Sequence, residues 1–285
     1  MNAFDVSTDI EIILQLLGIT VEEFAKRIKV HPATIYRWKT NEGMISKANL
    51  DVIYNFAFEN HIRLNQIKEQ FSKEECPNNS IILFHGAKTY IDGPISIEKS
   101  KETNDFGKGF YCGESLEQSS MFVAGYPNSS LYITQFNKSN LRNTKLNVDR
   151  DWMLLIAYFR KKLTSYSNHP IVLKLLSKLE GVDYIIAPIA DNRMFEIIDS
   201  FIEGEITDIQ CQHCLSATNL GNQYVLITQK ALNNLKILKH CYLSTAEKEY
   251  YLSSKQESSK IGNDKVKIAR IQYRGQGKYI EEILI

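Results

Sequence analysis

The chain has 285 residues, with 34 lysines and arginines against 33 aspartates and glutamates, so its formal net charge is +1. This balance excludes binding to nucleic acid or to a membrane through overall charge alone. Hydrophobic residues make up 44% and charged residues 24% of the chain, as in ordinary globular proteins with room for one small and one larger domain. The sequence lacks a membrane-spanning apolar run, a signal-peptide pattern and a disulfide framework, so we expect a cytoplasmic protein without a membrane partner.

Residues 8–60 show the apolar spacing of short amphipathic helices. The first is expected over 10–17. A second begins after Thr20, where Glu23 completes the pattern of a capping box. Pro32 would occupy the first turn of a third helix, and a fourth follows over 50–57.

This arrangement resembles the helix-turn-helix of the Cro and phage-repressor type, with residues 32–39 as the recognition helix. The resemblance implies that Ile35 and Trp38 pack inward. It also implies a set of side chains that face a DNA groove or phosphates: Thr34, Arg37 and Lys39.

The charge of this region does not point to strong DNA binding. Up to residue 74 there are nine lysines and arginines and ten aspartates and glutamates, so no broad basic surface draws the region to phosphates. A small helical module used for dimerisation or for docking on a partner protein is the alternative.

A polar stretch with one proline, residues 73–80, suits a linker. The sequence therefore predicts a helix-turn-helix domain over 1–72, a linker over 73–80 and a second domain over 81–285. In the second domain, strands such as 131–136 and 184–189 mix with helices such as 151–163 and 168–179 without a regular βαβ rhythm, which favours an α+β fold.

Two short motifs in the second domain indicate a ligand-binding site. An apolar strand at 81–84 ends in His85 and Gly86, so a polar side chain and a bare backbone meet at its end. About twenty residues later, the sequence reads Asn-Asp-Phe-Gly-Lys-Gly-Phe-Tyr over 104–111. Its glycines permit close backbone approach to a ligand, and Phe110 and Tyr111 offer a flat apolar face to a planar ring.

These motifs resemble the diphtheria-toxin-like branch of the ADP-ribosyltransferase superfamily, and more closely a bacterial family within it that carries Asn-Asp-Phe-Gly-x-Gly-Phe-Tyr. The likeness extends over roughly 80–240 and implies a split antiparallel sheet. It implies that His85 binds the NAD ribose, that the Gly86 backbone holds the carboxamide and that Tyr111 stacks on the nicotinamide. The residues expected to line the NAD site are His85, Gly86, Asp105, Phe106, Gly107, Gly109, Phe110 and Tyr111.

The third position of the site departs from the usual glutamate, because the strand beginning at 223 offers Gln223. An amide can hydrogen-bond a ribose hydroxyl but cannot stabilise developing positive charge as a carboxylate does. Asp191, after the strand at 184–189, is the first candidate for an acidic helper. Glu203 and Glu205, on a polar turn, are poorer ones.

No metal is expected, because Cys211 and Cys214 form a lone C-x-x-C without a second such pair, although His240 and Cys241 could in principle complete a zinc site. NAD would not be bound in the Rossmann manner, since G-x-G-x-x-G is absent. Residues 231–238 are expected to begin as a helix or turn. After Ser244, serine-lysine clusters at 253–255 and 258–260 predict loops.

The first hypothesis is therefore an NAD-dependent mono-ADP-ribosyltransferase with a DNA-binding-type N-terminal domain, acting in a bacterial cell as a toxin, toxin–antitoxin component or phage-defence effector. Its site would be His85, Tyr111 and Gln223, with Asp191 as helper; its acceptor is unidentified, and a cognate antitoxin is a candidate partner. The alternative is a transcriptional regulator whose degenerate transferase domain senses NAD or ADP-ribose without catalysis. A third is a protein-interaction module in which neither domain keeps its ligand.

Overall fold

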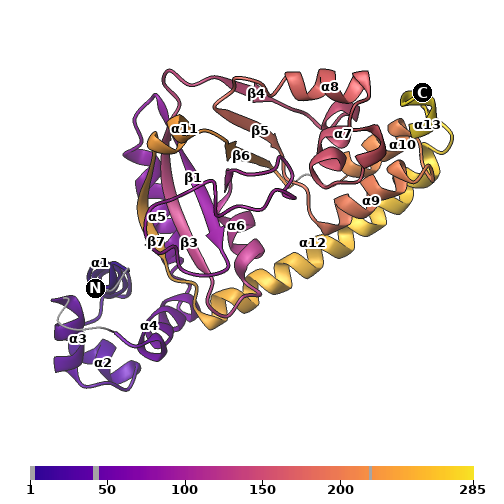
Figure 1. Cartoon of the computed structure of the whole chain (residues 1–285). Helices are drawn as coiled ribbons and strands as arrows, with labels where there is room; N and C mark the ends of the chain where they lie inside the picture. Colours follow the sequence, from indigo (N-terminus) through magenta and orange to yellow (C-terminus); the bar gives the residue numbers. More distant parts are fainter. Residues whose placement is uncertain (1–3, 41–44, 218–219) are drawn as a thin grey trace. The chain divides into compact units, whose positions relative to one another are not determined.

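The computed structural model describes residues 4–40, 45–217 and 220–285, which form two compact units (Figure 1). The first unit comprises Met1–Asp92, Leu116–Asn137 and Lys236–Ser254; the second comprises Gly93–Ser115, Lys138–Leu235 and Lys255–Ile285. Each unit therefore draws on separate stretches of chain. The domain boundaries expected from the sequence, 1–72, 73–80 and 81–285, follow another division and stay a prediction.

Five helices open the first unit: α1 (Val6–Leu17), α2 (Val21–Arg27), α3 (Pro32–Lys39), α4 (Lys47–Glu59) and α5 (Leu64–Glu74). Their starts follow local chemistry, since the Thr20 hydroxyl accepts the Glu23 N–H at 3.2 Å and Pro32 lies in the first turn of α3. Ile35 and Trp38 are buried with the apolar residues of α1, α2 and α4. The expected helices and the inward face of α3 are confirmed.

Buried polar groups fix these helices to one another. The Asp9 carboxylate on α1 accepts the Tyr54 hydroxyl of α4 and pairs with the Lys68 ammonium of α5 at 2.6 Å. A charge without a partner at such a position would cost several kcal/mol, so the lysine is a structural requirement. The Asn65 amide donates to the Tyr242 carbonyl at 2.9 Å, which ties α5 to the chain that follows the last strand of this unit.

The strands of the first unit are β1 (Ser80–Ala87), β3 (Ser130–Asn137) and β7 (Leu235–Cys241), in the order β1-β3-β7. β1 and β3 are antiparallel, and His85 lies opposite Tyr132. Helix α6 (Leu116–Val123) packs along these strands (Figure 1). Ile82 and Phe84 belong to the apolar cluster shared with α6, and because side chains alternate along a strand, His85 projects to the other face.

The second unit holds β2 (Phe110–Gly113), β4 (Asn143–Lys145), β5 (Tyr184–Pro188) and β6 (Asn222–Leu226), in the order β4-β5-β6-β2. β4 and β5 are parallel, whereas β5–β6 and β6–β2 are antiparallel. The helices are α7 (Arg150–Phe159), α8 (Pro170–Ser177), α9 (Asn192–Ile202), α10 (Asp208–Ser216), α11 (Gln229–Asn233) and α13 (Ile280–Ile283), with a 3₁₀ turn at Thr164–Tyr166. The expected α+β class is confirmed, with one parallel pair in a mixed sheet.

Residues 231–238 begin in helix α11, as expected, and continue into strand β7. The expectation of loops after Ser244 was wrong, because residues 253–255 and 258–260 lie inside α12 (Thr245–Gln272), one helix of 28 residues (Figure 1). Serine costs well under about 1 kcal/mol in a helix interior, and α12 contains no proline to end it. Buried residues on one face, such as Tyr251 and Ala269, supply the packing that the serines lack.

Within the described ranges, no helix combines the length and the apolar character needed to cross a membrane. Over the same residues there is no cluster of three or more histidine, cysteine, aspartate or glutamate side chains that could hold a metal ion. Cys211 and Cys214 are buried in α10, and burial raises the pKa of both thiols, which disfavours the thiolate form that metal binding needs.

Candidate functional site

Tyr111 closes the loop that contains the Asn-Asp-Phe-Gly motif. Its hydroxyl donates to the Gly107 carbonyl at 2.8 Å and accepts the Phe106 N–H at 3.1 Å. Gly107 has φ +71°, which strongly favours glycine there. Burial raises the pKa of the Tyr111 hydroxyl well above its usual value, so the group stays a hydrogen-bond donor at neutral pH.

A buried polar network fixes the same loop from the other side. The Asp105 carboxylate receives the Arg160 guanidinium at 2.8 Å and the Gln223 amide at 2.9 Å. The Gln223 amide also donates to the Pro188 carbonyl at 3.2 Å, and the Arg160 guanidinium lies 3.4 Å from the centre of the Phe195 ring. The network joins the loop to β5, β6, α9 and the end of α7. Charge-assisted hydrogen bonds of this kind are among the stronger ones, so the loop is held firmly.

Strand register places Tyr111 and Gln223 on one face of the sheet. Tyr111 lies opposite Val225, and Gln223 lies opposite Gly113, two residues along each strand. Partners in register project to the same face, and positions two residues apart share it. The structure thus brings together Tyr111, Gln223 and the loop at 105–107.

Asp191 is placed differently from a helper carboxylate. It is the N-cap of α9, where one oxygen accepts the Met194 N–H at 2.9 Å and the other pairs with Arg193 at 3.3 Å. Both oxygens therefore have structural partners. Its role as an acidic helper stays a prediction.

Packing explains the other glycines and Phe110. A Cβ at Gly109 would lie 2.7 Å from the Val225 side chain, and one at Gly86 would lie 2.8 Å from the Ser119 carbonyl. Both positions therefore require glycine even without a ligand. The Phe110 side chain is buried, and the Tyr111 ring is partly buried against the apolar core of the second unit.

His85 and Gly86 belong to the first unit, at the end of β1. The His85 ring lies 6.3 Å from that of Tyr132, and Tyr132 stacks on His240 with ring centres 4.6 Å apart. His240 in turn stacks on Phe4 at 4.2 Å. Burial lowers the pKa of His240 to about 4, so its ring is neutral at physiological pH. One row of rings therefore runs from His85 to Phe4, two residues before α1.

Sequence reasoning missed Arg160, Tyr132 and His240. Arg160 and Asp105 are 55 positions apart in the sequence, and an arginine just after a helix carries no local signal of its partner. Tyr132 could have been found by pairing the two apolar strands, but the register that places it opposite His85 comes only from the structure.

The three residues expected to face DNA differ in exposure. Arg37 is exposed on α3, with its guanidinium 3.4 Å from the Thr34 hydroxyl, which is half-buried. Lys39 is half-buried and pairs with Glu11 at 3.6 Å. Among Thr34, Arg37 and Lys39, Arg37 is therefore the side chain most accessible to a phosphate or a base edge.

Comparison with known proteins agrees with part of this description. Residues 10–53 match a helix-turn-helix family, so the N-terminal helices indicate DNA binding. Searches of curated proteins and of solved structures find no match. Residues 81–237, more than half of the chain, match the profile of a family described as proteins of unknown function (DUF3990). The chain therefore belongs to this family of proteins of unknown function.

Proposed function

We propose that the chain is an NAD-dependent mono-ADP-ribosyltransferase that acts in a bacterial cell as a toxin or defence effector, with its helix-turn-helix as the DNA-binding part. The observation that carries the proposal is the loop at 104–107, which Tyr111 holds through two hydrogen bonds and Asp105 through two more. The resemblance of the two motifs to ADP-ribosyltransferases gives the loop its chemical meaning.

The geometry suits such chemistry because a loop that is already ordered loses little conformational entropy when a ligand binds. The Tyr111 side chain is partly buried against the apolar core of the second unit, and its hydroxyl is hydrogen-bonded to the Gly107 carbonyl, so the ring is held in one position. Preorganised groups stabilise a transition state better than groups that must first be ordered.

In the proposed reaction, the bond between the nicotinamide nitrogen and the ribose anomeric carbon breaks, and the electron pair leaves with nicotinamide, which becomes neutral. The sugar develops oxocarbenium character. An acceptor nucleophile forms the new bond to the anomeric carbon and loses its proton to solvent or to a base. His85 would bind the ribose and Tyr111 would stack on the nicotinamide.

A second function is favoured by Gln223. Its amide is committed to Asp105 and to the Pro188 carbonyl, and it carries no negative charge to stabilise a sugar cation. A regulator that senses NAD or ADP-ribose without turnover would need only the binding part of the site. Both candidate functions require NAD binding. Only the transferase would move the ADP-ribose group from NAD to an acceptor.

The test is incubation of the full chain with NAD labelled in the adenylate part and with bacterial lysate, before and after nuclease treatment. Variants are His85→Ala and Tyr111→Ala. The control His61→Asn changes an exposed histidine whose φ of 63° asparagine tolerates. Circular dichroism checks that each variant is folded.

Transfer of label by the wild type and His61→Asn, lost in both site variants, supports the transferase, and nuclease sensitivity gives the acceptor class. Absence of transfer with NAD binding that Tyr111→Ala weakens in calorimetry supports the sensor. Absence of both transfer and NAD binding in a folded wild type would reject both candidates.

A further inference from the structure

The segment 255–278 is more basic than the rest of the chain. Residues 255–278 contain seven lysines and arginines and two acidic residues, whereas the whole chain has a net charge of +1. All seven cations are exposed. They lie on the last part of α12 and on the turn after it, within the second unit. A local concentration of this kind is an electrostatic footprint for a polyanion.

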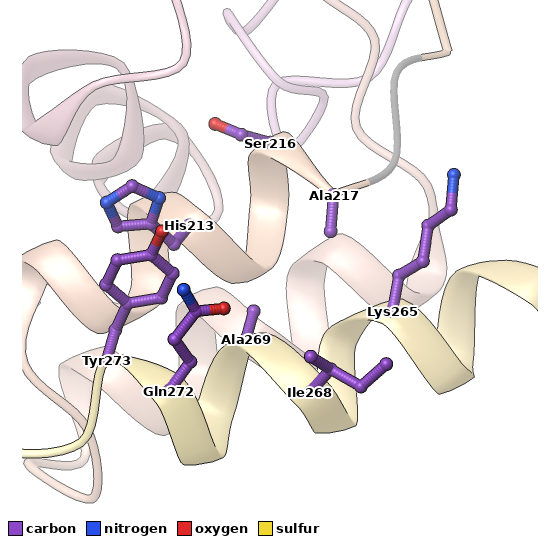
Figure 2. A pocket seen from close by; sticks show the side chains of 8 residues that line it. All are labelled: His213, Ser216, Ala217, Lys265, Ile268, Ala269, Gln272 and Tyr273. Carbon is purple, nitrogen blue, oxygen red and sulfur yellow. The ribbon is translucent and has the colours of Figure 1, made fainter.

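A pocket opens beside this basic segment, between α10 and α12. Its volume is about 320 Å³, and its lining residues are His213, Ser216, Ala217, Lys265, Ile268, Ala269, Gln272 and Tyr273 (Figure 2). The volume is at the small end of the range for ligand sites. The His213 and Tyr273 rings stack face to face, with centres 3.5 Å apart.

The lining combines the groups that a nucleobase needs. Figure 2 shows the aromatic pair at one end, the Gln272 amide beside it and the Lys265 side chain at the other end. An amide can donate to and accept from a base edge, and an aromatic ring offers a stacking face. No ion pair within the described part of the chain involves Lys265, so its ammonium is available to a phosphate.

We propose that this surface binds single-stranded nucleic acid: phosphates lie along the cations of 255–278, and one unpaired base enters the pocket beside Tyr273. The site is separate from the helix-turn-helix and does not depend on NAD. The exposed Ile268 and Ile271 give the strand an apolar edge on which to lie.

A membrane surface is the other polyanion that a basic helix with exposed isoleucines can meet. The pocket favours nucleic acid, because a lipid surface has no base that could stack on the aromatic pair or form hydrogen bonds with the Gln272 amide. Single strands are favoured over duplex because an unstacked base is free to enter a pocket of this size.

The test uses the full chain and fluorescein-labelled 20-nucleotide single strands of mixed sequence, as DNA and as RNA, followed by anisotropy at several salt concentrations without NAD. Arg37→Gln is present throughout to weaken binding by α3. The variants are Lys265→Gln combined with Lys267→Gln, and Tyr273→Leu. Lys174→Gln, at an exposed lysine of α8 in the same unit, is the matched control.

The double lysine variant is expected to bind several-fold more weakly and to flatten the dependence of affinity on salt by about 0.7 per lost phosphate contact. Tyr273→Leu is expected to lose about 5- to 100-fold if one base stacks there. Lys174→Gln should bind like its parent. Whether DNA or RNA binds more tightly identifies the source of the strand.

Unchanged affinity in the double lysine variant would overturn the proposal, as would a clear preference for duplex DNA. Vesicles of anionic and zwitterionic lipids provide the third arm. Stronger binding to the anionic vesicles than to either single strand, lost in the double lysine variant, would assign the surface to membranes instead. These outcomes are independent of whether label transfer from NAD occurs.

Discussion

Gln223→Glu tests the buried network most directly, because it introduces the residue type that the proposed resemblance to ADP-ribosyltransferases would place at this position. In the structure, the Gln223 amide donates to Asp105 at 2.9 Å. A carboxylate there is an acceptor facing another acceptor. We therefore expect the substitution to destabilise the second unit rather than to create a more active site.

The cost follows from two contributions. A hydrogen bond from an amide to a charged carboxylate is worth about 1.5–3 kcal/mol. Two like charges about 4 Å apart repel by about 4 kcal/mol at an effective dielectric constant of 20. Arg160, which already pairs with Asp105, offsets part of this repulsion. The expected loss is about 3–5 kcal/mol at pH 8.

The loss should depend on pH in a defined direction. The neighbouring charge raises the pKa of the introduced carboxyl in the folded state above its unfolded value of about 4.3. The penalty is therefore full above the raised folded pKa and shrinks as pH falls toward 4.3, because the protonated carboxyl can donate to Asp105 again.

Urea unfolding measures this in the background Trp38→Phe, where Trp152, fully buried in the second unit, is the only remaining tryptophan. Gln223→Leu removes the hydrogen bond without adding charge and should show a pH-independent loss. Gln256→Glu makes the same chemical change at an exposed position. If Gln223→Glu were as stable as the wild type at pH 8, the pairing of Gln223 with Asp105 would be refuted.

For three further substitutions, the direction of the change in stability can be predicted. Burial lowers the pKa of His240 to about 4 from 6.5, so the wild type loses stability as pH falls through this interval, and His240→Phe should show a smaller drop in melting temperature between pH 7 and 4.5. Burial raises the pKa of Glu247 to about 7 from 4.5, so Glu247→Gln should be more stable than the wild type at pH 8, with no difference below pH 4.5. Gly109→Ala puts a Cβ 2.7 Å from the Val225 side chain and should cost about 1–3 kcal/mol in urea unfolding. Gly125→Ala, whose nearest such atom is 3.8 Å away, should be close to neutral.

The N-terminal helices could be predicted because their signals are local. Thr20 caps α2 through a residue three positions away, and Pro32 needs only the first turn of its own helix. The resemblance to a helix-turn-helix then implies the inward face of α3, and its residues Ile35 and Trp38 are indeed buried. Nothing distant in the sequence is needed for these decisions.

The C-terminal helix shows the opposite case. The serines of α12 are weak helix formers, and its apolar residues are too widely spaced to stand out in a mostly polar stretch. Tertiary packing of Tyr251 and Ala269 decides the structure there. A local sequence pattern does not contain this packing, because the contacting residues lie far along the chain. The pattern therefore indicates a loop where the structure has a helix.

The residues of the motif loop could be named from the sequence, but the distant contacts that hold the loop could not. The motif at 104–111 contains Asp105, whose partners Arg160 and Gln223 come from the end of α7 and from β6. Glycine in the motif was predicted from close approach to a ligand, whereas the Cβ contact at Gly109 shows that strand packing already demands it. A glycine pattern therefore carries less information about a ligand than its spacing suggests.

The contacts of Asp105 also explain why residue 223 is a neutral amide rather than a carboxylate. Asp105 lies in the loop that Tyr111 closes, and its carboxylate is held by one cation and one amide. A second carboxylate at 223 would place two negative charges beside Arg160, which already pairs with Asp105. Asp105 and Gln223 therefore function as a matched pair. Within the proposed transferase, Asp105 is thus the negative charge that the motif loop itself supplies, and the amide at 223 keeps that charge in place.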